Sequence, residues 1–329
     1  MGLMAAGLVM RGLLLMVCLS VALAGCAAPR AQPAATATFG ASTQSTPTAV
    51  SEPLTHAVGR TPVATPTVAT RAVPTSTAVP RAPALSGLLD SVVPENSASE
   101  YALVLEDLAS GVRTAVNADQ SLPSASLYKL GVAWALMRLV QAGSVRLDLQ
   151  LEIEDDDAVE PEPEGGFGVG ETPSVQDALA AMLSVSSNAS AHALLRLLGR
   201  DAFTAEMDRI GLHQTRVPDD GLAVTSAADI ARLLRLIATS PELSAASRST
   251  IAQAMANIAP PDALRDTLPE SVGIFDKTGN LEDASNVGAL LETPRATAIL
   301  VVIDTQVDPG DARAVIAEAG QIAYHALLQ

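Results

Sequence analysis

Cysteine and aromatic residues are scarce in this sequence. Its 329 residues include two cysteines, both within the first 26 positions, and aromatic side chains make up 2% of the chain. No disulfide can therefore cross-link the rest of the chain, and no cysteine–histidine spacing typical of a metal site occurs. The four histidines are scattered, so we expect no metal and no cofactor. Hydrophobic residues reach 48%, which predicts a sizeable core of leucine, valine, isoleucine and alanine.

Basic residues are also few, and their shortage excludes one class of partner. The formal net charge is −16, and residues 84–329 contain 35 acidic against 15 basic residues. A surface of this sign repels nucleic-acid phosphates and anionic lipid headgroups, and no basic stripe interrupts it. We therefore expect no nucleic-acid partner.

The first 26 residues have the pattern of an export signal. Arg11 provides a short positive region, and the apolar run at residues 12–22 is too short to span a bilayer. Residues 23–26, Leu-Ala-Gly-Cys, resemble the lipobox of bacterial lipoproteins, in which cleavage leaves a lipid-modified cysteine at the new N-terminus. The alternative is an ordinary cleaved signal with an incidental cysteine. The pattern predicts an exported protein, anchored through Cys26 at the outer face of the cell membrane or in the periplasmic envelope.

A segment without periodicity follows, residues 27–83. It is rich in alanine, threonine and proline, which predicts a disordered linker with polyproline II character. As a flexible coil of about 57 residues it would average about 40 Å from end to end. The folded domain is then expected at residues 84–329.

The folded region has strand patterns at both ends and helical patterns between them. Strands are predicted at 101–108, 112–116, 272–278, 285–291 and 296–304. Helices are predicted at 85–93, 126–142, 175–183, 189–198, 203–210, 226–238, 243–258 and 312–328, and residues 152–170 are predicted to be a loop. This order predicts an α/β (α+β) chain with one antiparallel sheet flanked by helices and an inserted all-helical subdomain at about residues 125–225.

The chain contains just two lysines, Lys129 and Lys277, against 18 arginines. Lysine differs from arginine in having a compact amine that can lose its proton. Lys129 ends the motif Ser-Leu-Tyr-Lys, residues 126–129, at the start of a helix that is apolar on nearly every face and therefore buried. Because positions i and i+3 share a helix face, the amine should reach the Ser126 hydroxyl and act, uncharged, as its base. A capping serine with a surface lysine is the alternative.

Two further polar motifs occur in the chain. Residues 277–279, Lys-Thr-Gly, lie on a predicted strand, where the lysine suits a substrate carboxylate and the glycine allows close approach of a ligand. Residues 186–188, Ser-Ser-Asn, follow an apolar helix, so that Ser186 could shuttle a proton and Asn188 could donate to a substrate amide. Each motif alone also has a structural explanation: an exposed lysine at a turn, and a polar turn that caps the next helix.

Together and in this order, the three motifs resemble those of the penicillin-recognising serine enzymes. The sequence around Ser126 (PSASLYKL), around Asn188 (MLSVSSNASAHALL) and at residues 225–229 (TSAAD) is similar to class A β-lactamases, and the resemblance covers about residues 84–329. It implies the β-lactamase/transpeptidase type of fold and a reaction that needs neither metal nor histidine.

The resemblance also implies a role for each motif residue. Ser126 would form the acyl-enzyme, with Lys129 and Ser186 transferring protons. The substrate would be bound by the remaining motif residues and one neighbour: Asn188 at the acyl side-chain amide, Lys277 and Thr278 at the carboxylate, Gly279 in close approach, and Asn280, whose N–H would form the oxyanion hole with that of Ser126.

One feature of class A enzymes is missing. They carry a Glu-x-x-x-Asn loop whose glutamate activates the water that releases the acyl group, but the corresponding residues, 211–225, hold no glutamate and are trimmed. Ser187 also stands where the family usually has aspartate. Asp219 and Asp220 are the local carboxylates that could substitute, although a misplacement of about 1 Å can cost ~100-fold in rate.

Three functions are therefore compatible with the sequence. The first is hydrolysis of β-lactams through an acyl-enzyme that breaks down slowly. The second is a D-Ala-D-Ala carboxypeptidase-like enzyme, or a penicillin-binding receptor with little turnover, whose natural partner is a peptidoglycan stem peptide. The third is a Ser–Lys peptidase. We expect a monomer in each case.

Overall fold

The computed structural model describes residues 85, 87–158, 160–219, 221–259 and 262–328. All of them belong to the second of the two units into which the chain divides, residues 74–329. The predicted signal and linker, including Cys26, lie outside the described residues, as does Asp220. Those predictions stay as they are.

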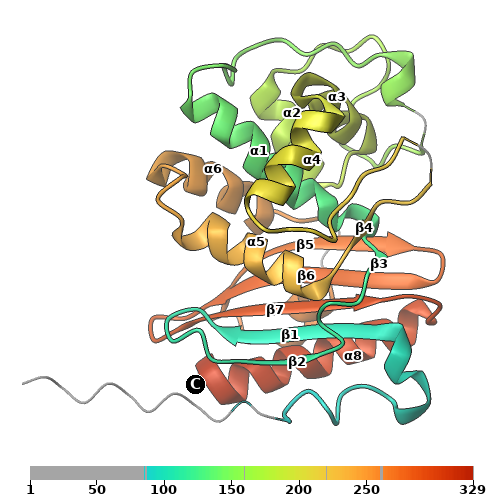
Figure 1. Cartoon of the computed structure of the whole chain (residues 1–329), viewed down its shortest axis with the longest axis vertical. Helices are drawn as coiled ribbons and strands as arrows, with labels where there is room; N and C mark the ends of the chain where they lie inside the picture. Colours follow the sequence, from blue (N-terminus) through green and yellow to red (C-terminus); the bar gives the residue numbers. More distant parts are fainter. Residues whose placement is uncertain (1–84, 86, 159, 220, 260–261, 329) are drawn as a thin grey trace, which may run out of the picture. The chain divides into compact units, whose positions relative to one another are not determined.

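A five-stranded antiparallel sheet, in the order β2-β1-β7-β6-β5, occupies the lower part of Figure 1. Its strands are β1 (Tyr101–Asp107), β2 (Arg113–Val116), β5 (Gly273–Leu281), β6 (Ala284–Glu292) and β7 (Thr297–Asp304). A separate two-stranded ladder pairs β3 (Leu122–Pro123) with β4 (Val224–Thr225). The two ends of the described region thus supply the strands of the sheet, with helices between them, and the predicted fold class is confirmed.

Both faces of the sheet are covered, and the alternation of side chains shows how. In β1, Ala102 and Val104 point into one hydrophobic core, whereas Leu103 and Leu105 point into the other, as the two-residue period of a strand requires. Helix α5 (Ala227–Thr239) belongs to the first core and α8 (Pro309–Ala323) to the second. Strands β1, β6 and β7 are consequently buried almost throughout.

The remaining helices stand mainly above the sheet in Figure 1. They are α1 (Lys129–Gln141), α2 (Val175–Ser184), α3 (Asn188–Leu198), α4 (Arg200–Arg209), α6 (Ala245–Ala256) and α7 (Ala263–Thr267). Short single-turn segments are η1 (Glu95–Glu100), η2 (Ala125–Tyr128), η3 (Asp155–Asp157) and η4 (Tyr324–Leu328). Serine side chains cap α2, α3, α5 and α6 by accepting from a backbone N–H of the first turn, and this fixes where those helices begin.

Two local predictions differ from the structure. The helix predicted at residues 85–93 is a series of turns, in which Leu88 and Val92 donate to carbonyls three residues earlier. Gly87, at φ +77°, interrupts any helix there. The helix predicted from Ser126 begins instead as the tight turn η2, and α1 follows from Lys129.

Within the described residues, no helix has the length and apolarity needed to cross a membrane.

Candidate active site

Ser126 lies in the tight turn η2, between a capping serine and the buried helix α1. The Ser124 hydroxyl accepts a hydrogen bond from the N–H of Tyr128 at 2.8 Å and so closes the turn. Ala125, directly before Ser126, has φ +44°, a left-handed conformation that residues other than glycine seldom adopt. Nine residues of α1 are buried behind this turn. The surrounding core therefore holds the serine in position at the cost of local backbone strain.

Strand β5 passes close to this turn at Gly279. A Cβ atom at position 279 would lie 2.8 Å from the backbone nitrogen of Ser126 and 2.9 Å from the Cβ of Ala125. Only glycine fits such an approach without movement of the backbone. The third motif and the first are thus brought into direct contact by packing.

A hydrogen-bonded chain links the two serines and the first lysine. Ser186 Oγ donates to Ser126 Oγ at 2.9 Å. The Nζ of Lys129 donates to Ser186 Oγ at 3.3 Å, to the Ser186 carbonyl at 2.7 Å and to Asn188 Oδ1 at 2.6 Å. The sequence predicted that Lys129 would contact Ser126 directly, whereas the structure places the Ser186 hydroxyl between them. Ser186 itself has φ +62°, which turns it into this bridging position.

The protonation of Lys129 reflects two opposing influences. Its side chain is fully buried, and burial lowers its pKa from 10.5 to about 8, while the carboxylates of Glu160 and Glu162 act in the opposite direction. Burial thus shifts the pKa of Lys129 toward neutrality, the direction that favours the uncharged amine predicted from the sequence.

Lys277 is also fully buried, on β5. Its Nζ donates to the carbonyl of Thr278 at 2.7 Å. Burial, and to a smaller extent the charge of Lys129, lower its pKa from 10.5 to about 7, although Asp276 acts in the opposite direction. The two lysines of the chain are therefore close enough to repel each other, and neither faces bulk water.

A cleft of about 570 Å³ opens above these groups. Six of the predicted site residues line it: Ser126, Ser186, Asn188, Asp219, Thr278 and Asn280. The two lysines are fully buried and do not line the cleft. Gly279, on β5, packs against the turn that holds Ser126. The structure therefore brings the three sequence motifs into one site.

Asp219, one of the two predicted substitutes for the missing loop glutamate, lines the same cleft. Its side chain is 91% exposed and forms an ion pair with Arg200 at 3.3 Å. Arg200 also donates to the carbonyls of Val217 and Pro218 at 3.3 and 3.1 Å, which fastens this loop to the start of α4. The Asp219 carboxylate is thus exposed to solvent and paired with Arg200, and it is not buried next to Ser126.

Two carboxylates that the sequence analysis passed over lie in the cleft. Glu160 and Glu162 belong to the segment predicted only as a loop. Glu162 accepts hydrogen bonds from the N–H groups of Asn188 and Ala189, at 2.8 and 2.9 Å, and so satisfies the start of α3. The available signal was the run Glu-Pro-Glu-Pro-Glu at residues 160–164, rich in acids yet without periodicity.

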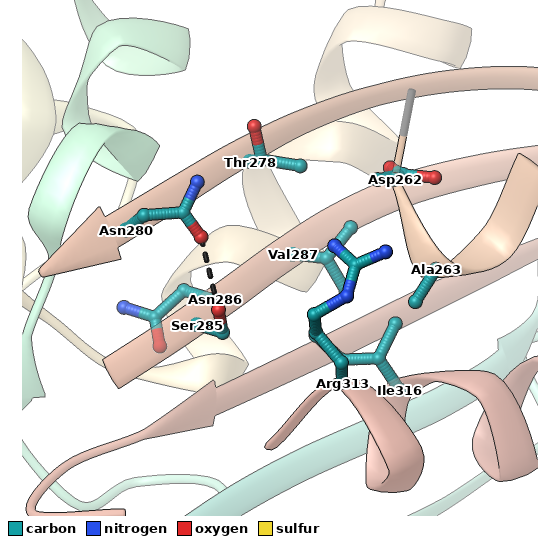
Figure 2. A pocket seen from close by; sticks show the side chains of 9 residues that line it. All are labelled: Asp262, Ala263, Thr278, Asn280, Ser285, Asn286, Val287, Arg313 and Ile316. Carbon is teal, nitrogen blue, oxygen red and sulfur yellow. Dashed lines mark hydrogen bonds between the residues drawn. The ribbon is translucent and has the colours of Figure 1, made fainter. Parts of the chain in front are cut away.

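A small cavity of about 70 Å³ behind β5 is lined by Arg313, a basic residue that the sequence analysis also missed. Figure 2 shows the Arg313 side chain rising from α8 toward the strands, with Asp262 across the cavity and Thr278 on β5. At one end, Ser285 donates to the Oδ1 of Asn280 at 3.0 Å. Arg313 thus adds a guanidinium group behind the Lys-Thr-Gly strand, outside the lining of the cleft, where it is ion-paired with Asp266 at 3.2 Å.

No group of three or more metal-binding side chains occurs within the part of the chain that the structure describes.

Comparison with known proteins agrees with this site. A family model described as the β-lactamase enzyme family matches residues 84–327. An ancestral (GNCA) class A β-lactamase is 30% identical with a TM-score of 0.64, over 73% of this chain and 96% of that one. A β-lactamase from Xanthomonas campestris pv. campestris is 25% identical with a TM-score of 0.64, over 71% and 96% of the two chains. The structure of PBP-A, 21% identical with a TM-score of 0.66 over 73% and 93%, shares the fold. The matched region extends through the sheet, the helices and all three motifs, and this chain belongs to the β-lactamase enzyme family.

Proposed function

We propose that the protein is a serine β-lactamase-like hydrolase that forms an acyl-enzyme at Ser126. The observation that carries the proposal is the hydrogen-bonded chain from Ser126 through Ser186 to the buried amine of Lys129. A serine needs a neighbouring base to become a nucleophile, and this chain provides a path to one. Membership of the family supports β-lactams as the substrates.

The acylation step can be written with its protons balanced. With the Lys129 amine uncharged and both hydroxyls rotated so that Ser126 donates to Ser186 and Ser186 to Lys129, the Ser126 oxygen attacks the β-lactam carbonyl carbon, and its proton passes to Ser186 as the Ser186 proton passes to Lys129. When the carbon–nitrogen bond breaks, the nitrogen takes a proton from Ser186, which regains one from Lys129. Backbone N–H groups in the first turn of a helix have no intrahelical partner, so that of Ser126 is available to stabilise the developing oxyanion.

Slow release of the acyl group is part of the proposal. The carboxylates that line the cleft are each engaged elsewhere or exposed: Glu162 by two backbone N–H groups, Asp219 by Arg200, and Glu160 at the surface. This supports slow deacylation, which the absence of a glutamate from residues 211–225 also suggests. A second candidate function follows from the same observation, namely a D-Ala-D-Ala carboxypeptidase-like enzyme or receptor that acts on peptidoglycan stem peptides.

One experiment separates these functions. The full exported chain is mixed with a chromogenic cephalosporin, and product is followed beyond one equivalent of enzyme, in parallel with labelling by a fluorescent penicillin. Sustained turnover supports the hydrolase, and a burst of one equivalent supports the carboxypeptidase-like enzyme or receptor. Ser126→Ala should lose both signals, and Ser121→Ala, a change at an exposed serine, should keep them. Labelling that survives Ser126→Ala would refute the nucleophile.

We also propose that the protein is an exported, lipid-anchored monomer. The support is the lipobox-like tetrapeptide at residues 23–26 and the linker-like composition of residues 27–83. Cells fed labelled palmitate should yield labelled protein that is lost in Cys26→Ala and retained in Cys18→Ala. Label that persists in Cys26→Ala would contradict the anchor, and sedimentation of the detergent-free domain would test the monomer.

A further inference from the structure

Glu162 contacts the start of α3 from the acidic segment at residues 160–164. Its carboxylate oxygens accept hydrogen bonds from the N–H groups of Asn188, at 2.8 Å, and Ala189, at 2.9 Å. Helix α3 has no acidic residue in its own first turn. Backbone N–H groups at a helix start lack intrahelical partners, so a carboxylate there is stabilising. Glu162 therefore supplies this charge from a position 26 residues earlier in the chain.

The same segment orients the side chain of Asn188. The Nδ2 of Asn188 donates to the carbonyl of Pro161 at 3.2 Å, and its Oδ1 accepts from the Nζ of Lys129 at 2.6 Å. Because the donor and the acceptor of an amide lie on opposite sides, the bond to Pro161 leaves the oxygen turned toward Lys129. The amine also donates to the carbonyl and the hydroxyl of Ser186, at 2.7 and 3.3 Å. The place of the amine thus depends on where the acidic segment holds Asn188.

Gly166 leaves the space that the Glu162 carboxylate occupies. A Cβ atom at position 166 would lie 2.6 Å from the Oε1 of Glu162 and 2.7 Å from its Cγ. The N–H of Gly166 donates to the carbonyl of Pro163 at 3.0 Å, which closes a turn around this side chain. A residue with a side chain at position 166 would therefore push the carboxylate away from α3.

We propose that Glu162 is a positioning residue for the reaction at Ser126: it fixes the start of α3 and, through Asn188, holds the Lys129 amine against Ser186. This inference rests on the proposed function, because the quantity that Glu162 changes is the rate of acylation at Ser126.

The charge of Glu162 gives the proposal a readout that a purely structural cap would not move. Burial lowers the pKa of Lys129, and the carboxylates of Glu160 and Glu162 act in the opposite direction. On the other side, Lys277 of β5 is close enough for the two amines to repel each other. Removal of the Glu162 charge should therefore lower the pKa of Lys129 and move the rising limb of the acylation pH profile to lower pH.

Glu162→Gln keeps the length of the side chain and one acceptor oxygen but removes the charge. The acylation rate constant at saturating β-lactam is measured by quenched-flow mass spectrometry between about pH 6 and 9. Because a misplacement of about 1 Å can cost ~100-fold, we expect a loss of about tenfold at the optimum, together with the shifted limb. The control is Glu164→Gln, an exposed carboxylate of the same segment that does not line the cleft, and it should change neither.

Gly166→Ala displaces the carboxylate without removing it. The atoms that must move belong to the flexible side chain of Glu162, so the variant should fold and acylate about tenfold more slowly. Gly168→Ala is the control, because its Cβ would meet only the Oε2 of Glu171, at an ordinary 3.5 Å. Gly166→Ala also decides the question if Glu162→Gln fails to fold.

Two substrates separate positioning of the amine from binding of the substrate. Benzylpenicillin has the acyl amide that Asn188 is expected to bind, and 6-aminopenicillanic acid lacks it. The loss in Glu162→Gln should be the same for both, and a loss confined to benzylpenicillin would overturn the inference. Normal acylation by Gly166→Ala, an unmoved limb in Glu162→Gln, or an equal loss in either control would also overturn it. Failure of the unaltered protein to be acylated at Ser126 would instead overturn the proposed function.

Discussion

Replacement of Gly279 by alanine tests whether the closeness of β5 to the nucleophile turn sets the acylation rate. The added Cβ would lie 2.8 Å from Ser126 N, 2.9 Å from Ala125 Cβ and 3.1 Å from the Ser124 carbonyl oxygen. None of these atoms is the flexible end of a side chain, so the turn or the strand must move. An ordinary contact begins at 3.4 Å, which requires a shift of about 0.6 Å at the closest pair.

That shift sets the expected size of the effect. Because a misplacement of about 1 Å at a reacting group can cost ~100-fold, a shift of just over half that distance predicts an acylation rate constant lower by about tenfold. Overpacking of this kind also costs roughly 1–3 kcal/mol of unfolding free energy. Stopped-flow labelling with a fluorescent penicillin gives the rate constant, and urea unfolding gives the stability.

Gly288→Ala provides the matched control. On the neighbouring strand β6, a Cβ at position 288 would meet Ile230 Cγ2 at 2.8 Å and Leu234 Cδ1 at 3.6 Å, which are side-chain atoms on α5. This variant should lose comparable stability while acylating at the normal rate. Normal acylation by Gly279→Ala, or an equal slowing in Gly288→Ala, would refute the argument that packing at Gly279 positions the nucleophile.

Four further outcomes are expected. Lys129→Arg should reduce acylation by at least 100-fold although the charge is kept, because a guanidinium group does not deprotonate in proteins; normal labelling would remove lysine as the base. The acylation rate should show a narrow optimum between pH 7 and 8: it rises as Lys129, with its pKa of about 8, loses its proton, and falls as Lys277, with its pKa of about 7, loses the charge needed for the substrate carboxylate. A flat profile from pH 6 to 9 would contradict both assignments. Arg313→Ala should weaken apparent binding of a carboxylate-bearing β-lactam by roughly tenfold, and unchanged saturation kinetics would exclude Arg313 from carboxylate binding. Burial and Asp262 raise the pKa of Asp276 to about 8, although its ion pair with Arg265 acts in the opposite direction. The folded state therefore holds a proton that the unfolded state releases above pH 4, and stability should fall as pH rises from about 4 to 8, by at most ~1.4 kcal/mol per pH unit. Asp276→Asn should flatten this slope in urea titrations, and a parallel pH dependence in variant and unaltered protein would contradict it.

The motif residues could be placed from the sequence because their relations are local or forced by buried segments. A serine and a lysine three positions apart at the start of an apolar helix are expected on one face, and the structure joins the two through Ser186. The sequence left the burial of Lys277 open, and its strand β5 is the edge strand that pairs with β6. The sheet could be predicted because β1 and β7 are nearly continuous apolar runs.

Other parts of the site depend on contacts that no local pattern encodes. Glu162 reaches the start of α3 from a segment without periodicity, 26 residues earlier in the chain. Arg313 faces the Lys-Thr-Gly strand only because α8 packs across that end of the sheet. The role of Ser186 as a bridge depends on its left-handed backbone, which its amino-acid type gives no reason to expect.

The two residues of the site that have a left-handed backbone, Ala125 and Ser186, also affect how the protein becomes active. Neither conformation is locally favoured, and the groups they orient come from segments about 60 residues apart, with Lys277 a further 91 positions along the chain. A partly assembled chain would let both backbones relax and separate the reacting hydroxyls. During refolding, penicillin should therefore acylate only fully folded protein. The time course of this labelling should coincide with the last phase in which tryptophan fluorescence changes.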